Sequence, residues 1–124
     1  MRAPRFMIAS DLHGAAGYTR RLIEAWERER SDMLILLGDL LYHGPRNPLP
    51  EGYAPQETAA LLNARRERLV CVRGNCDADV DQMVLEFPIL SDSCLLCAGG
   101  RTVLATHGHL WNTQKRPPLC PGDV

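Results

Sequence analysis

The 124-residue sequence has no long apolar run and no long block of charge of one sign. Its apolar runs are too short for a membrane-spanning helix or a signal-peptide core, so we expect a cytoplasmic protein with no membrane partner. The net charge is −1, and the largest basic block is Arg65-Arg66-Glu67-Arg68. The sequence therefore lacks the electrostatic footprint that binding of duplex nucleic acid requires.

A second Cys-x-x-Cys pair is also missing. Cys94 and Cys97 have the spacing of half a structural zinc site, but no other cysteines form a matching pair, and the alternation around them also fits a β-strand. A cysteine-based zinc-binding module is therefore the weakest of three hypotheses for function. The chain has five cysteines, an odd number, and no export signal, which favours reduced thiols.

What is present is the composition of an ordinary globular protein, with 45% hydrophobic and 23% charged residues. At this length the chain can bury one core but not two, so we expect residues 1–124 to form a single domain. The apolar run at 33–37 lies between two helical patterns, which predicts a central parallel strand of an α/β fold, covered on both faces. We expect the run at 6–9 to form a buried first strand.

Other patterns predict the remaining elements. A strand is expected at 69–72, and a β-hairpin at 94–98 and 102–106, joined by Gly99 and Gly100. Helices are expected at 16–30, 55–66 and, as one short turn, 80–85. In the first helix, Tyr18 and Trp26 occur at core-facing spacing. Prolines and glycines make residues 42–55 irregular, and we interpret this segment as a stiff rim over a site, with an association surface as the alternative.

Polar side chains follow four of the strand-like runs at their carboxyl ends, namely those at 6–9, 33–37, 69–72 and 102–106. Open α/β sheets bind ligands beyond this edge, and strands connected by right-handed crossovers bring their ends together there. Asp11 and His13 are two residues apart, so on extended backbone both side chains would point to one side. The candidate ligands that follow the runs are, in chain order, Asp11, His13, Asp39, Asn75, His107 and His109.

Carboxylate, amide and imidazole groups form a mixed oxygen and nitrogen shell. Such a shell suits Mn²⁺, Fe²⁺ or Zn²⁺ and suits Ca²⁺ poorly. Asp39 is the candidate to bridge two cations. Two cations about 3.5–4 Å apart can hold a bridging hydroxide as the nucleophile for displacement at phosphorus.

Each candidate also has an ordinary structural interpretation. Asp39 could cap a turn after Gly38, Asn75 could belong to a Gly-Asn turn, and the two histidines could lie in a solvated loop. Those interpretations must all hold at once to exclude a metal site. The segment beginning at Asp77 imitates a calcium loop but lacks its glycine and its glutamate.

The ordered motifs resemble those of the calcineurin-like metallophosphoesterases. They are Asp11-Leu12-His13, Gly38-Asp39, Gly74-Asn75-Cys76-Asp77 and His107-Gly108-His109. Residues 42–55 and 80–83 are similar to the YfcE-type bacterial phosphodiesterases in particular. The resemblance implies an αββα sandwich with two packed sheets and a dinuclear metal site. It also implies hydrolysis of small phosphodiesters with two divalent ions, Mn²⁺ being expected and Zn²⁺, Fe²⁺ or Ni²⁺ being alternatives.

The resemblance also assigns roles. Asp11, His13 and Asp39 would bind the first metal, and the second would be bound by Asp39, Asn75 and His107. Asn75, Cys76 and His107 are the implied catalytic residues. Arg73 and His109, together with Asn75, are the implied substrate-binding residues.

Two departures from the family pattern matter. Cys76 stands where most members have a histidine that assists the leaving oxygen, so alkyl phosphomonoesters should be poor substrates and diesters with acidic leaving groups should be favoured. A covalent role for the Cys76 thiol is disfavoured, because a metal-activated hydroxide would lie closer to phosphorus.

The second departure is that the chain reaches Val124 without the family's Gly-His-x-His motif. We therefore expect only the N-terminal portion of the sandwich, with the last strands of the second sheet missing and an exposed edge that would favour homo-oligomers. The alternative to an enzyme is a non-catalytic fragment that keeps a partial metal site and acts as a binding or association module.

Overall fold

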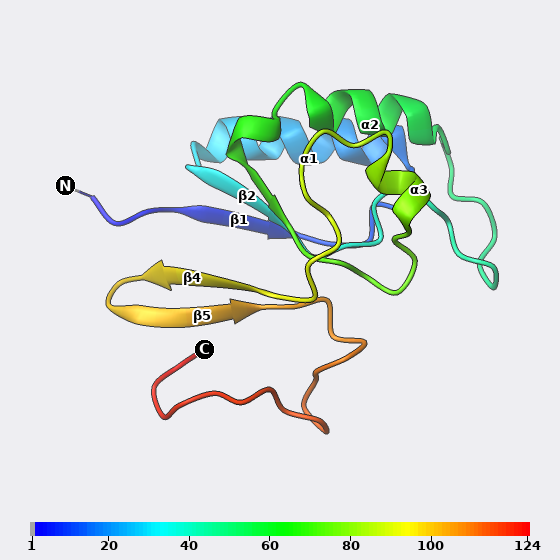
Figure 1. The fold of residues 1–124 in the computed structure, drawn as a ribbon. Helices are drawn as coiled ribbons and strands as arrows, with labels where there is room; N and C mark the ends of the chain where they lie inside the picture. Colours follow the sequence, from blue (N-terminus) through cyan, green and yellow to red (C-terminus); the bar gives the residue numbers. More distant parts are fainter. Residues whose placement is uncertain (1) are drawn as a thin grey trace.

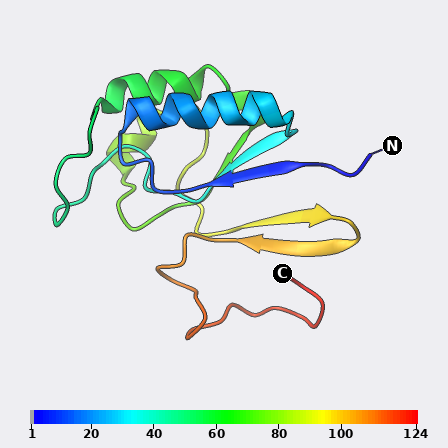
Figure 2. The same ribbon diagram turned by 180° about the vertical axis from the view of Figure 1, so that it is seen from behind.

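The computed structural model describes residues 2–124, which form three layers (Figure 1). Strands β1 (Phe6–Ala9), β2 (Met33–Leu36) and β3 (Leu69–Cys71) form a parallel sheet in the order β1-β2-β3. Two long helices lie side by side over one face of this sheet, and a β-hairpin lies below the other face in both views (Figures 1 and 2). The α/β class is therefore confirmed, and residues 2–124 contain the first three layers of the expected αββα order.

Strand β2 is central and covered on both faces, as its unbroken apolar sequence predicts. Leu34 and Leu36 belong to the core cluster shared with the helices, and both are fully buried. Ile35 points to the opposite face, because strand side chains alternate, and it is also fully buried. The prediction that β1 is buried is wrong, since it is an edge strand in which Ile8 is 54% exposed.

The helices follow the predicted periodicity closely. Helix α1 (Ala16–Glu29) ends one residue before its predicted boundary, whereas α2 (Pro55–Asn63) is three residues shorter than predicted. A 3₁₀ turn (Arg66–Arg68) follows α2, and α3 (Asp79–Gln82) is a single short turn. In residues 2–124, none of the helices combines the length and the apolar character that crossing a membrane would require.

Only one of the two aromatic residues of α1 faces the core. Trp26 is 3% exposed and donates its indole N–H to the Ser31 carbonyl. Tyr18 is 56% exposed, with the Arg21 guanidinium 5.5 Å from its ring centre. The prediction that Tyr18 packs in the core is therefore wrong, because it lies on the solvent side of the helix.

The predicted hairpin is formed by β4 (Cys94–Ala98) and β5 (Arg101–Ala105). Gly99 and Gly100 join them with φ values of +58° and +74°, as a tight two-residue hairpin turn requires. Cys94 and Cys97 point to opposite faces of β4, because they are three residues apart on a strand. The zinc-module hypothesis is therefore wrong, and no group of candidate metal ligands within residues 2–124 includes either cysteine.

Candidate metal centre

The loops after β1 and β2 carry the first candidate ligands on left-handed backbone. Asp11, His13 and Asp39 have φ values of +62°, +47° and +55°. Such a conformation costs a non-glycine residue roughly 1–2 kcal/mol, and strain of this kind collects at functional sites. The two side chains of the first loop do converge, but the reason given above is wrong, because a left-handed turn rather than extended backbone directs them.

Two glycines allow the strand ends to approach one another. A Cβ atom on Gly38 would lie 2.2 Å from the backbone nitrogen of Gly74, and one on Gly74 would lie 2.1 Å from the Asp39 carboxylate. Neither contact is possible for a larger side chain. The Gly-Asp and Gly-Asn pairs therefore bring their polar residues together because the preceding glycines permit close packing.

Asp77 holds the loops after β2 and β3 together through hydrogen bonds to their backbone. Its buried carboxylate accepts N–H groups from Asp39 (2.8 Å), Leu40 (3.1 Å) and Gly74 (2.7 Å). The sequence motifs alone did not indicate this role for Asp77. The available signal was the position of the aspartate three residues after Gly74, in a turn whose N–H groups need an acceptor.

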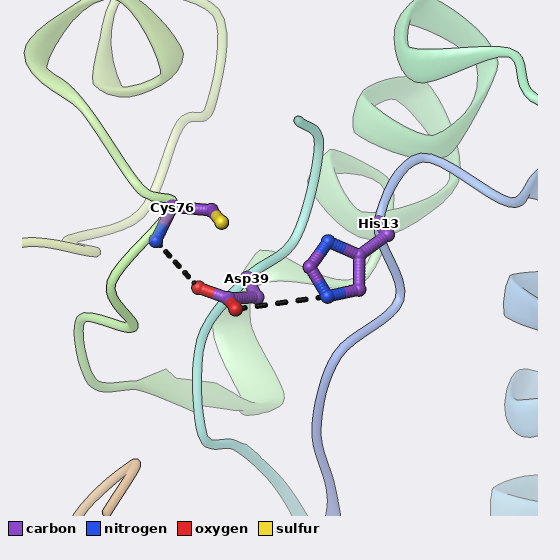
Figure 3. A group of neighbouring side chains, drawn as sticks. All are labelled: His13, Asp39 and Cys76. Atoms are coloured by element: carbon purple, nitrogen blue, oxygen red, sulfur yellow. Dashed lines mark hydrogen bonds and ion pairs between the residues drawn. The ribbon is translucent and has the colours of Figure 1, made fainter. Parts of the chain in front are cut away.

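Asp39 occupies the centre of the site and is only 2% exposed. Its Oδ1 atom accepts the backbone N–H of Cys76 at 2.8 Å. Its Oδ2 atom lies 3.6 Å from Nε2 of His13 and 3.5 Å from Nε2 of His107. Figure 3 shows the carboxylate of Asp39 between His13 and the backbone of Cys76. One buried carboxylate oxygen is thus shared by two imidazoles.

Backbone carbonyls orient the imidazoles of His13 and His107 by contacting the Nδ1 atom, the ring nitrogen that does not face Asp39. The Nδ1 atom of His13 lies 2.7 Å from the Tyr42 carbonyl oxygen, and Nδ1 of His107 lies 2.6 Å from that of Leu37. A carbonyl only accepts, so each Nδ1 carries hydrogen, and in the neutral ring Nε2 presents a lone pair towards Asp39.

Other acceptor atoms face the same space. His107 Nε2 lies 3.0 Å from the amide oxygen of Asn75, and His13 Nε2 lies 3.2 Å from Oδ1 of Asp11. Lone pairs that converge in this way need positive charge between them, either protons on the rings or metal cations. The donor set of carboxylate, amide and imidazole groups fits a divalent transition metal.

Two groups of candidate ligand atoms share Asp39, and they differ in membership from the two predicted ligand sets. One contains Asp11, Asp39 and His107, and the other contains His13, Asp39 and Cys76, with the ligand atoms of each group within 4.8 Å of one another. The structure thus brings together five predicted ligands. They are Asp11, His13, Asp39, Asn75 and His107.

The site alters the proton affinity of its members. Burial of the His13 ring opposes its charged form, but the hydrogen bond to the Tyr42 carbonyl and the nearby Asp11 and Asp39 carboxylates raise its pKa overall. Burial also opposes ionisation of Asp11, yet the hydrogen bond from the Ser10 hydroxyl and the contact with the His13 ring lower its pKa. The site therefore attracts cationic charge.

Cys76 is held as a neutral thiol. Burial and the carboxylate of Asp39 raise the pKa of this thiol. Because the thiolate and not the thiol is the nucleophile, this environment gives Cys76 little nucleophilic character at neutral pH.

The two remaining predicted substrate ligands lie further out. The guanidinium of Arg73 binds the Asp92 carboxylate at 3.1 Å and 3.3 Å, so its charge is already paired. His109 is exposed, and its ring centre lies 5.3 Å from that of His107 in an edge-on arrangement. His109 is not a member of either group of candidate ligands around Asp39.

The irregular segment 42–55 borders the site. Besides the carbonyl that orients His13, it lines a cavity of about 370 Å³ together with Asn75 and Cys76, to which it contributes Arg46 and Asn47. Its preferred interpretation as a rim is therefore supported.

The fold and the site define the class of protein. Residues 4–119 match the model of the calcineurin-like phosphoesterase family, and the chain belongs to this family. It is 43% identical over 120 residues to the phosphodiesterase YfcE of Escherichia coli strain K12, covering 97% of this chain. The same identity is found with the YfcE proteins of strains O6:H1 and O157:H7. The chain spans 65% of the length of these relatives.

Solved structures agree with this assignment. The structure of E. coli YfcE, described as a phosphoesterase, matches with a TM-score of 0.94 and 42% identity, covering 97% of this chain and 66% of that one. A predicted phosphoesterase from Streptococcus pneumoniae matches with a TM-score of 0.51 at 21% identity, over 92% of this chain and 51% of the other. The second match supports the fold alone.

Proposed function

We propose that this chain binds two divalent metal ions and hydrolyses small phosphodiesters. The observation that carries the proposal is the buried Oδ2 atom of Asp39, 3.6 Å and 3.5 Å from two imidazole nitrogens that are oriented by backbone carbonyls. A carboxylate placed between two groups of ligands is the arrangement expected for a bridge between two cations. The names of the YfcE relatives support a diester as the substrate.

Asp11, His13 and Asp39 would hold one ion, because Nε2 of His13 lies against both carboxylates. Asp39, Asn75 and His107 would hold the other, because Nε2 of His107 lies against the Asn75 amide oxygen and the Asp39 carboxylate. The oxygen and nitrogen donors fit Mn²⁺, with Zn²⁺, Fe²⁺ and Ni²⁺ as alternatives. Two such ions supply a nucleophilic water and neutralise charge on phosphate oxygens. The chain's own residues position the substrate, since the amide of Asn75 is exposed at the site and offers N–H donors to a phosphate oxygen.

The neutral Cys76 thiol determines which esters react. A thiol is a weak proton donor, so it gives little assistance to an alkoxide leaving group. Diesters with acidic leaving groups need little protonation and are the preferred substrates.

The location of this activity is inferred from the cysteines. All five are free thiols, which supports action in the reducing cytoplasm.

Hydrolysis of bis(p-nitrophenyl) phosphate by the 124-residue chain with added Mn²⁺ tests the proposal. We expect Mn²⁺-dependent release of nitrophenolate that Asp39→Asn abolishes and Asp79→Asn, an exposed position at the start of α3, leaves unchanged. Metal binding without turnover would contradict the hydrolase and favour the binding-module alternative.

A further inference from the structure

An apolar groove opens beside the candidate metal centre, between α2 and the turn of α3. Its volume of about 720 Å³ lies in the range of small-molecule sites, roughly 300–1,000 Å³. Val80 and Val84 at its edge are 65% and 53% exposed. The side chains that line it are mainly apolar or aromatic and include Leu41, Tyr42, Tyr53, Ala59, Ala60 and Val84.

Side-chain hydrogen bonds hold the two walls of the groove in place. Asn63, at the end of α2, donates to the Val84 carbonyl (2.9 Å) and accepts the N–H of Glu86 (2.8 Å). Asp81, the only carboxylate in the lining, accepts the N–H of Ala78 at 3.1 Å. The groove is thus preformed, and its one acidic group is already engaged.

The groove is continuous with the metal centre through Cys76 and Tyr42. Cys76 lines the groove, and its sulfur belongs to the ligand group of His13 and Asp39, whose atoms lie within 4.8 Å of one another. The residue that orients His13 through its carbonyl, Tyr42, also lines the groove. A phosphate held at Asp39 would therefore have an apolar recess next to it.

We propose that this groove receives an aromatic or extended apolar ester group of the phosphodiester. The inference rests on the proposed function and names its substrate class. An aromatic ring would cover the exposed valines and contact the two tyrosines, whereas an anionic ester group would find no basic side chain among the residues that line the groove. Burial of such a group contributes binding free energy that a methyl ester cannot supply.

Calorimetry on the Mn²⁺-loaded chain tests this with two probes, diphenyl phosphate and dimethyl phosphate, which carry the same charge. Diphenyl phosphate should bind about tenfold to a hundredfold more tightly. Ala60→Trp, at an exposed groove position of α2, should reduce this ratio towards one and leave dimethyl phosphate binding unchanged. The matched control Ala64→Trp, exposed at the end of α2 and outside the groove, should keep the ratio.

Val84→Gln, at an exposed position of the opposite wall, should lower the ratio as well and serves if Ala60→Trp fails to fold. Equal binding of the two probes, or a ratio unchanged in both variants, would overturn the inference while leaving metal-dependent phosphate binding intact. Failure of both probes to bind the metal-loaded chain would instead overturn the proposed function. If Ala60→Trp changes only the sedimentation behaviour, the groove is a contact between copies of the chain and the inference is wrong.

Discussion

The carboxylate of Asp77 binds the backbone N–H of Asp39 at 2.8 Å, across 38 positions of sequence. The same carboxylate accepts the N–H groups of Leu40 and Gly74, so one buried side chain joins the loops that follow β2 and β3. The residue that carries the proposed metal bridge is thus positioned by a residue that need not touch the metal.

Removal of this acceptor should be strongly destabilising. Asp77→Ala leaves three N–H groups without their partner, and each unsatisfied buried group costs about 1–3 kcal/mol. We expect the free energy of unfolding, measured with urea, to fall by about 3 kcal/mol or more. The control Asp79→Ala, at an exposed position, should cost less than about 1 kcal/mol. Equal losses in the two variants would contradict the positioning role.

Gly38 should not tolerate any side chain. Gly38→Ala places a methyl group 2.2 Å from the Gly74 nitrogen at a φ of +100°, so the loops must separate. We expect loss of cooperative unfolding or of metal binding. Gly52→Ala is the matched control, since it has a φ of +70° but nothing within 4 Å. It should cost only about 1 kcal/mol, and a similar loss at both positions would show that close packing is unimportant.

Cys76→Ser should retain the proposed activity. If the thiol is neutral and does not attack phosphorus, the hydroxyl can replace it with a change in kcat of less than about tenfold. Turnover of bis(p-nitrophenyl) phosphate at saturating Mn²⁺ measures this. A loss of several orders of magnitude, with metal stoichiometry unchanged, would indicate a covalent role for the cysteine.

The stability of the metal-free chain should depend on His13. Its pKa is raised in the folded state from an ordinary value of 6.5. The stabilisation is therefore fully present below pH 6.5 and is lost as the pH rises through the folded-state pKa. Urea unfolding in chelator should show this decrease, and His13→Gln should remove it. Metal competes with the proton, so affinity for Mn²⁺ should change in the opposite direction and weaken as the pH falls. If the free energy of unfolding in chelator and the affinity for Mn²⁺ changed with pH in the same direction, the proposal that the proton and the metal compete for His13 would be contradicted.

Much of this arrangement is predictable from local sequence. The period of apolar residues locates α1 to within one residue, and the unbroken apolar run identifies β2 as central. Polar residues after three strands indicate the site because parallel topology brings strand ends together.

The remaining features depend on contacts between distant segments. The hydrogen bond from Arg73 to Asp92 joins residues 19 positions apart, and the sequence around either residue does not predict it. The same holds for the exposed position of Ile8 on β1, which is an edge strand of the parallel sheet. Left-handed backbone at Asp11 and His13 is imposed by hydrogen bonds to the Gly38 and Asp39 carbonyls, so periodicity does not reveal it.

The shared carboxylate of Asp39 is tested most directly by electron paramagnetic resonance of the chain titrated with Mn²⁺, because this readout does not require turnover. Two Mn²⁺ ions held by one shared carboxylate would be magnetically coupled. We predict a coupled two-ion spectrum for the wild type and at most one uncoupled ion for Asp39→Asn. A wild-type chain that binds no Mn²⁺, or an Asp39→Asn variant with the same coupled spectrum, would contradict the account.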